Sequence, residues 1–230
     1  MKSKNNFTFV KNLSKSFIYS PFIMIDKKKA EFANSISHGI AFVIFAIASV
    51  FLLQKGTTQN SPVFMFGLII FIVSILLLYG FSTAYHVAQK EKLKHTLRHF
   101  DHAAIYILIA GSYTPILLGV IQGTLGWIVF GIIWFLAISG ILYEMFFLGK
   151  HPKVSLVLYL SMGWIVVLIA KPFWDAASAQ VLICMLLEAL FYTTGTYFYW
   201  KDKKHTYFHA IWHVFVWLGT LSHFVAVWLI

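Results

Sequence analysis

The residues best suited to chemistry in this sequence are histidines that lie one helical turn from another polar side chain. His209 and His213 are four positions apart, so on an α-helix their imidazoles share one face and can direct nitrogen atoms at one ion. Ser82 and His86 have the same spacing, and Asp101 follows in the next apolar segment. Three neutral imidazoles that leave one coordination position for water are typical of catalytic zinc. The pattern predicts a zinc site on His86, His209 and His213.

Two further side chains complete this predicted site. Asp101 would accept a proton from a zinc-activated water or orient one of the ligands, and Ser82 would be a hydrogen-bond partner. An isolated His-x3-His near the end of a membrane helix is more often interfacial polar packing than a metal site. The choice between the two interpretations depends on whether His86 and Asp101 reach the depth of this histidine pair.

The composition indicates the environment of the site. The 230 residues are 60% hydrophobic, 18% aromatic and 11% charged, whereas about a quarter of the residues of a soluble domain are charged. A mean hydropathy of +0.78 excludes a disordered chain. The single cysteine, Cys184, excludes an intrachain disulfide scaffold. These values indicate one compact domain that lies in a membrane.

Seven apolar segments have the roughly 17 to 25 residues that a helix needs to cross a bilayer. We therefore predict an all-α, polytopic membrane protein, with a basic interfacial segment over 1–30 and a seven-helix transmembrane domain over 31–230. Turns are expected at breaker pairs such as Lys171-Pro172, and an interruption of the third span is expected at Pro115. The predicted spans are 36–53, 62–87, 103–121, 125–148, 154–170, 179–200 and 207–230.

The basic residues indicate how these spans are oriented. With loops on alternating sides, 16 of the 18 Lys and Arg residues fall on one side, and only Lys55 and Lys171 fall on the other. Because basic loops remain in the cytoplasm, we expect a cytoplasmic N-terminus and an outward C-terminus. The segment over 1–30 lacks the pattern of a cleaved signal peptide. The formal net charge of +10 thus reflects topology, and the dispersed lysines form no nucleic-acid-binding groove.

This topology brings the polar residues into one layer. His86 lies at the cytoplasmic end of its span, Asp101 at the cytoplasmic start of the next, and His209 with His213 at the cytoplasmic start of the last. With a rise of about 1.5 Å per residue, all four lie a turn or two below the membrane surface. The shared depth brings the metal site level with simple packing as an interpretation, and both stay open at this point.

These motifs resemble those of the haemolysin III proteins, which belong with the progestin and adipoQ receptors and, more distantly, with the alkaline ceramidases. The resemblance extends from about residue 27 to the end of the chain. It rests on five motifs in order: Glu31-x2-Asn34-x2-Ser37-His38-Gly39, Ser82-x3-His86, Arg98-His99-Phe100-Asp101-His102, Tyr106-x4-Gly111-x-Tyr113-Thr114-Pro115 and His209-x3-His213.

The resemblance implies a seven-helix protein with a cytoplasmic N-terminus and a zinc ion near the cytoplasmic face. By position, it implies that His86, His209 and His213 ligate the metal. It also implies that Ser82 and Asp101 lie beside the metal-bound water. The short N-terminus is similar to that of the bacterial branch, which implies a multi-pass protein of the cell membrane without hormone binding.

Two other polar groups leave alternatives open. Glu31, Asn34 and His38 share one face of the first span, where we interpret them as support for the metal layer rather than as ligands. A second group could form a rival metal cluster, but interleaved cations favour a solvated surface instead. Its members are His95, His99 and His102.

Three ionisable residues lie outside the family motifs. Glu144 and Glu188 are interpreted either as hydrogen-bonded packing residues or as part of a polar route. His223 lies about 21 Å along the helix from His209, too far to share its ion. We interpret it as a packing residue deep in the bilayer.

Two functions are compatible with these features. The first is a zinc-dependent hydrolase that acts on amides or esters of membrane lipids. The alternative is a non-enzymatic sensor of membrane homeostasis, or a cytolytic, pore-associated protein, in which zinc is structural. A zinc-free helical bundle is the simplest competing interpretation.

Overall fold

The computed structural model describes residues 21–230, and its secondary structure is helical. Seven helical runs in this part of the chain are long and apolar enough to cross a membrane, which confirms the predicted all-α, seven-span fold. The elements are α2 (Pro21–Thr58), α3 (Pro62–Val87), α4 (Glu91–Pro115), η1 (Ile116–Ile121), α5 (Gly123–Phe147), α6 (Pro152–Gly163), η2 (Trp164–Ile169), α7 (Ala170–Ala176), α8 (Ala179–Lys201), η3 (Asp202–Lys204) and α9 (Phe208–Leu229).

The helix that carries the first predicted span, 36–53, is longer than that span, because α2 is continuous from Pro21 to Thr58. Charged residues such as Lys27 mark where the helix leaves the apolar layer, and a helix need not end there. Of the basic segment predicted over 1–30, residues 1–20 lie outside the described part of the chain, and the remainder is the first part of α2.

The prediction of a turn at Lys171-Pro172 is wrong. The fifth span runs from Lys153 to Ala176 through α6, η2 and α7, and both residues lie inside α7. Pro172 is in the first turn of α7, where a missing backbone N–H costs little because such groups have no acceptor within their own helix. The chain turns instead before Ser178, whose side chain caps α8.

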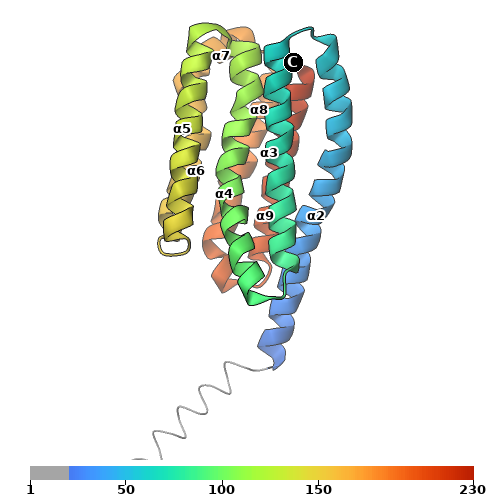
Figure 1. The fold of residues 1–230 in the computed structure, drawn as a ribbon, viewed down its shortest axis with the longest axis vertical. Helices are drawn as coiled ribbons and strands as arrows, with labels where there is room; N and C mark the ends of the chain where they lie inside the picture. The colour runs from blue at the N-terminus through green and yellow to red at the C-terminus, as the bar shows by residue number, and fades with distance from the viewer. Residues whose placement is uncertain (1–20) are drawn as a thin grey trace, which may run out of the picture.

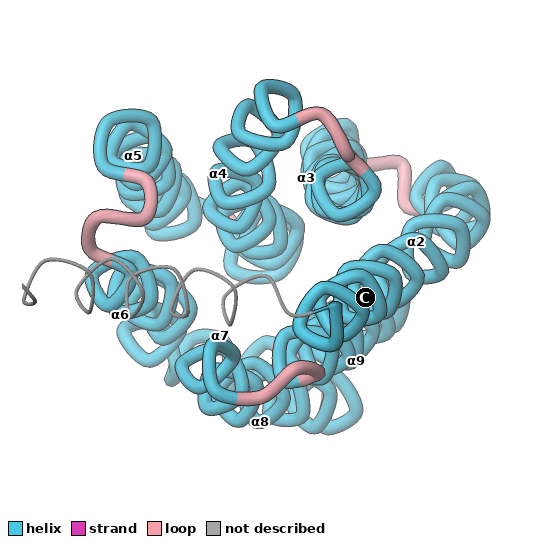
Figure 2. Tube along the Cα trace, turned by 90° about the horizontal axis from the view of Figure 1, so that it is seen from below, coloured by secondary structure: helices cyan, strands magenta, loops and turns pink. Residues whose placement is uncertain are grey.

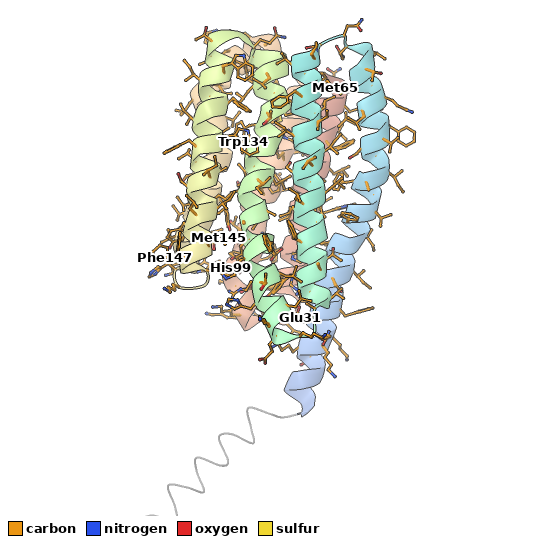
Figure 3. All side chains as sticks on the ribbon, in the orientation of Figure 1. Glu31, Met65, His99, Trp134, Met145 and Phe147 are labelled. Carbon is orange, nitrogen blue, oxygen red and sulfur yellow. The ribbon has the colours of Figure 1, made fainter. Side chains whose placement is uncertain are left out.

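The spans stand side by side with their axes roughly aligned (Figure 1). Viewed from one end, they form a ring (Figure 2), in which neighbours in the sequence pack on one another and α9 packs on both α8 and α2. Because the spans alternate in direction, the last turn of α3 and the first turns of α9 lie at the same end. Figure 3 shows Glu31 and His99 at this end, which we call the histidine end, and Met65 near the opposite end.

The outer surface of the ring is apolar. Phe135 and Leu168, for example, expose 70% and 81% of their surface, while Tyr79 and Phe45 are fully buried inside. Such an exterior is unfavourable in water and matches the hydrocarbon of a bilayer. The chain is a multi-pass membrane protein.

The interruption predicted at Pro115 is confirmed, and it takes the form of a change in helix type. Pro115 ends α4, and the span continues as the π-helical segment η1. At its end the N–H of Gln122 donates to the carbonyl oxygen of Leu117 over 2.9 Å, five residues back. Gly67 of α3 packs against this point, and a Cβ atom added there would lie 2.9 Å from the Cα atom of Pro115.

Candidate metal centre

The structure brings the three predicted histidine ligands together. His86 comes from the last turn of α3, and His209 and His213 come from the first two turns of α9. Each offers a ring nitrogen, and the three nitrogens lie within 4.8 Å of one another. His86 and His213 are buried, whereas the side chain of His209 is 23% exposed. The spacing of these atoms is that of a site for one ion.

The orientation of His86 is held by a carboxylate from α2. Its Nδ1 atom lies 2.7 Å from Oε2 of Glu31, and the second oxygen of Glu31 lies 3.0 Å from Nζ of Lys94. A carboxylate accepts, so Nδ1 carries the proton and Nε2 presents its lone pair. That Nε2 atom is buried and has no hydrogen-bond partner among the described residues.

The two histidines of α9 are held in the same way. Nδ1 of His209 lies 3.0 Å from Oδ2 of Asp202, in the short 3-10 turn before α9. Nδ1 of His213 lies 3.2 Å from the carbonyl oxygen of Asn34 and 2.9 Å from Oγ of Ser37. Because a carbonyl oxygen only accepts, His213 also carries its proton on Nδ1.

With each Nδ1 held in this way, the Nε2 atoms of the three clustered imidazoles are left to bind an ion. Metal-ligating histidines almost always donate their other N–H to a carboxylate or a carbonyl, which fixes the tautomer and raises the basicity of the ligand. Three neutral imidazoles are a donor set that suits zinc. Within residues 21–230 no comparable group forms around His95, His99 and His102.

Asp101 and Ser82 lie in the same layer. Asp101 is buried in the third turn of α4, with Oδ2 3.5 Å from Nδ1 of His102, and it is close enough to His86 for its charge to act there. Ser82 precedes His86 by one turn, and in the part of the chain that the structure describes its buried hydroxyl has no hydrogen-bond partner by distance and angle. Both residues are where the sequence places them, and their chemical roles stay predictions.

A cavity of about 170 Å³ extends from this layer into the bundle. Asp101 and His38 lie at its histidine end, and Glu188 and His223 line it farther in. Along α4 and the start of η1 its wall runs from Asp101 to Ile116, about 22 Å at 1.5 Å per residue. Most of the lining is aliphatic or aromatic, so the cavity suits an apolar chain.

Sequence reasoning missed two features of the interior. Asp202 was not considered, although a carboxylate seven residues before His209 is a usable signal once the turn between them is known. His223 is not merely packed: Nδ1 lies 2.8 Å from Oε2 of Glu188, and Nε2 donates to the carbonyl oxygen of Ser112 over 2.9 Å. Glu188 is therefore hydrogen-bonded, as one of its two interpretations required.

Two of the α2 residues expected to support the metal layer contact the candidate ligands: Glu31 bonds to His86 through its carboxylate, and Asn34 bonds to His213 through its backbone carbonyl. Glu144 is buried and accepts a hydrogen bond over 3.4 Å from the hydroxyl of Tyr159. It thus meets the description of a hydrogen-bonded packing residue.

Comparisons with known proteins give consistent results. The profile of a family described as haemolysin-III related matches residues 27–224. The chain is 41% identical over 200 residues to the Hemolysin-3 homolog of Bacillus subtilis, covering 86% of this chain and 93% of the relative. It is 36% identical over 199 residues to Hemolysin-3 of Bacillus cereus, covering 86% and 90%.

A more distant similarity reaches mammals. The chain is 28% identical over 207 residues to the human monocyte to macrophage differentiation factor, covering 85% of this chain and 82% of the relative. No solved structure matches the chain. The bacterial relatives and the seven apolar helices support a multi-pass protein of a bacterial cell membrane.

Proposed function

The chain belongs to the haemolysin-III-related family, and on that premise we propose that it binds zinc and hydrolyses an amide or ester bond of a membrane lipid. The single observation that carries the proposal is the orientation of His86, His209 and His213. Each Nδ1 is held by a protein oxygen, so each Nε2 is available to a metal. We place the site on the cytoplasmic side, because the loops at the histidine end carry most of the lysines.

Zinc bound by three imidazoles supplies a Lewis acid that polarises a carbonyl and lowers the pKa of water to about 7. The protein supplies the proton transfer. Asp101 lines the cavity beside the histidines, so its carboxylate takes the proton of the attacking water and returns it to the departing amine or alcohol. Ser82 lies close to that carboxylate, and its hydroxyl, unpaired within residues 21–230, would turn toward it to orient it during the reaction.

The substrate class follows from the cavity and its surroundings. The wall is mostly apolar along about 22 Å of α4 and the start of η1, which is long enough for an extended acyl chain. The outward faces of the helices contact membrane lipid, so a lipid reaches the site without crossing water. The bond to be broken then lies at the polar end of the cavity, beside Asp101.

Turnover of lipids by the purified protein tests this function. The protein in nanodiscs would be mixed with long-chain ceramide-like amides and with acyl esters, and released fatty acid would be measured by mass spectrometry. We expect release that stops on removal of zinc with a chelator and returns with added zinc. A panel in which no amide or ester is cleaved contradicts the proposal.

The name of the Bacillus cereus relative, Hemolysin-3, favours a second candidate: a non-enzymatic cytolytic or membrane-homeostasis protein. In that role zinc would be structural and would tie α3 to α9. Leakage of dye from liposomes separates the two functions, because a pore needs no turnover and a hydrolase needs no conductance.

A further inference from the structure

His38 of α2 lies between the candidate metal centre and the cavity. Its side chain is 1% exposed and lines the cavity together with Asp101. Its ring stacks on that of His213, with centroids 3.5 Å apart and planes 13° apart, and it meets the ring of Tyr79 edge-on at 4.9 Å. These two neighbouring rings therefore fix its position.

This stacking keeps His38 from acting as a ligand of the same ion. The nitrogen lone pairs of an imidazole lie in the plane of the ring, and the planes of His38 and His213 run nearly parallel. An ion in the plane of His213 therefore lies to one side of the plane of His38. In agreement, the group of converging nitrogens includes His86, His209 and His213 but not His38.

Both ring nitrogens of His38 are buried and, by distance and angle, have no hydrogen-bond partner within the described residues, although the backbone of His213 lies close by. A neutral imidazole has one N–H donor and one acceptor, and burying such a group without a partner is unfavourable. The bare Nε2 atoms of His86 and His209 are accounted for by a metal. A metal does not explain the unpaired nitrogens of His38. The space that this side chain faces is the cavity.

We propose that His38 binds the substrate, donating an imidazole N–H to the carbonyl oxygen of a lipid amide or ester whose chain fills the cavity. The inference rests on the proposed function and names the group that recognises the reacting bond. Asp101, at the same end of the cavity, carries acceptor oxygens that repel a carbonyl oxygen. His38 offers an imidazole N–H at that end, and the aliphatic wall beyond it receives the chain.

Paired probes test this bond without relying on catalysis. N-Methylhexadecanamide and octadecane have chains of equal length, and only the amide has a carbonyl. Their dissociation constants would be measured for wild type, His38→Phe, His38→Gln and the control His95→Phe in identical nanodiscs. His95 is exposed at the histidine end and does not line the cavity. Comparing variants in the same bilayer cancels the partitioning of each probe into lipid.

We expect His38→Phe, which keeps an aromatic ring on His213, to lower the preference for the amide about tenfold, the size of one hydrogen bond of about 1.4 kcal/mol. His38→Gln keeps an N–H donor and should recover most of the preference, while His95→Phe should leave it unchanged. The zinc content should be the same in all four proteins. An unchanged preference in His38→Phe overturns the inference, and so does a loss of zinc that accompanies the loss of preference.

A measurement on the wild-type protein keeps the inference testable if a variant does not fold. The carbonyl stretch of the 13C-labelled amide should move to lower frequency when the probe passes from lipid to the protein, because a hydrogen-bonded carbonyl is weakened. The absence of a shift overturns the inference. Absence of zinc or of turnover in the wild type would instead overturn the proposed function, while the probe preference would remain.

Discussion

Nδ1 of His86 lies 2.7 Å from Oε2 of Glu31, and this contact joins the first two spans at the histidine end. The partners are 55 residues apart in the sequence. The bond fixes the tautomer of His86 and turns its Nε2 atom toward His209 and His213. Glu31 thus acts on the candidate metal centre without being a ligand.

Weakening this contact should weaken metal binding. We expect Glu31→Gln to lower zinc affinity by about 10- to 100-fold, the usual effect of losing a carboxylate partner of a metal-bound histidine. Isothermal titration of the metal-free protein with zinc measures the change. The exposed Glu91 provides a matched control, so Glu91→Gln should bind zinc as the wild type does. Equal affinities of the two variants would refute the role of Glu31.

Asp101→Asn should separate metal binding from chemistry. The amide keeps the shape of the side chain but cannot take a proton, so lipid turnover should fall by about 10²- to 10⁴-fold while the zinc content is retained. Asp175→Asn is the control, because Asp175 is exposed at the opposite end, in a salt bridge with Lys171. Full turnover by Asp101→Asn would remove this residue from the mechanism.

The pair of Glu188 and His223 predicts a thermodynamic cycle. His223→Leu leaves a carboxyl group without its partner in the interior, so the free energy of unfolding should fall by about 3 kcal/mol or more. The double variant Glu188→Leu with His223→Leu removes both groups and should recover most of this loss. Unfolding in mixed micelles would measure both changes. The pair is not coupled if the double variant loses as much free energy of unfolding as the two single variants lose together, or more.

The close approach of α3 and α4 predicts the effect of one methyl group. In Gly67→Ala the new Cβ atom meets the backbone of Pro115 at 2.9 Å, and backbone atoms cannot move aside as a flexible side chain does. We expect a loss of about 1 to 3 kcal/mol in the free energy of unfolding. Gly131→Ala introduces the same group where no atom of the described chain lies within 4 Å and should not destabilise the protein. Similar stability of the two variants would argue against this close contact between α3 and α4.

Much of the fold was predictable because membrane spans are encoded locally. Apolar length and breaker residues identify the seven spans, and the spacing of His209 and His213 places both on one helix face without any tertiary information. The common depth of His86 and Asp101 followed from counting residues from the loops. These relations need only the rise and period of a helix.

The remaining features depend on how the helices rotate and pair. Asp202 reaches His209 through a turn whose shape no periodicity encodes. Glu188 meets His223 only because α8 and α9 pack with those faces together. At Pro172 the sequence predicted a turn that does not exist. Proline often marks a turn, but here it lies in the first turn of α7.

Metal analysis of the purified protein tests the candidate zinc site most directly. We expect one zinc ion per wild-type chain and none in the variant His209→Ala with His213→Ala. The control is His95→Ala with His99→Ala, a second pair with the same spacing at the histidine end, which should retain its zinc. A wild-type protein without metal, or the same zinc content in both double variants, would contradict a zinc site on His86, His209 and His213.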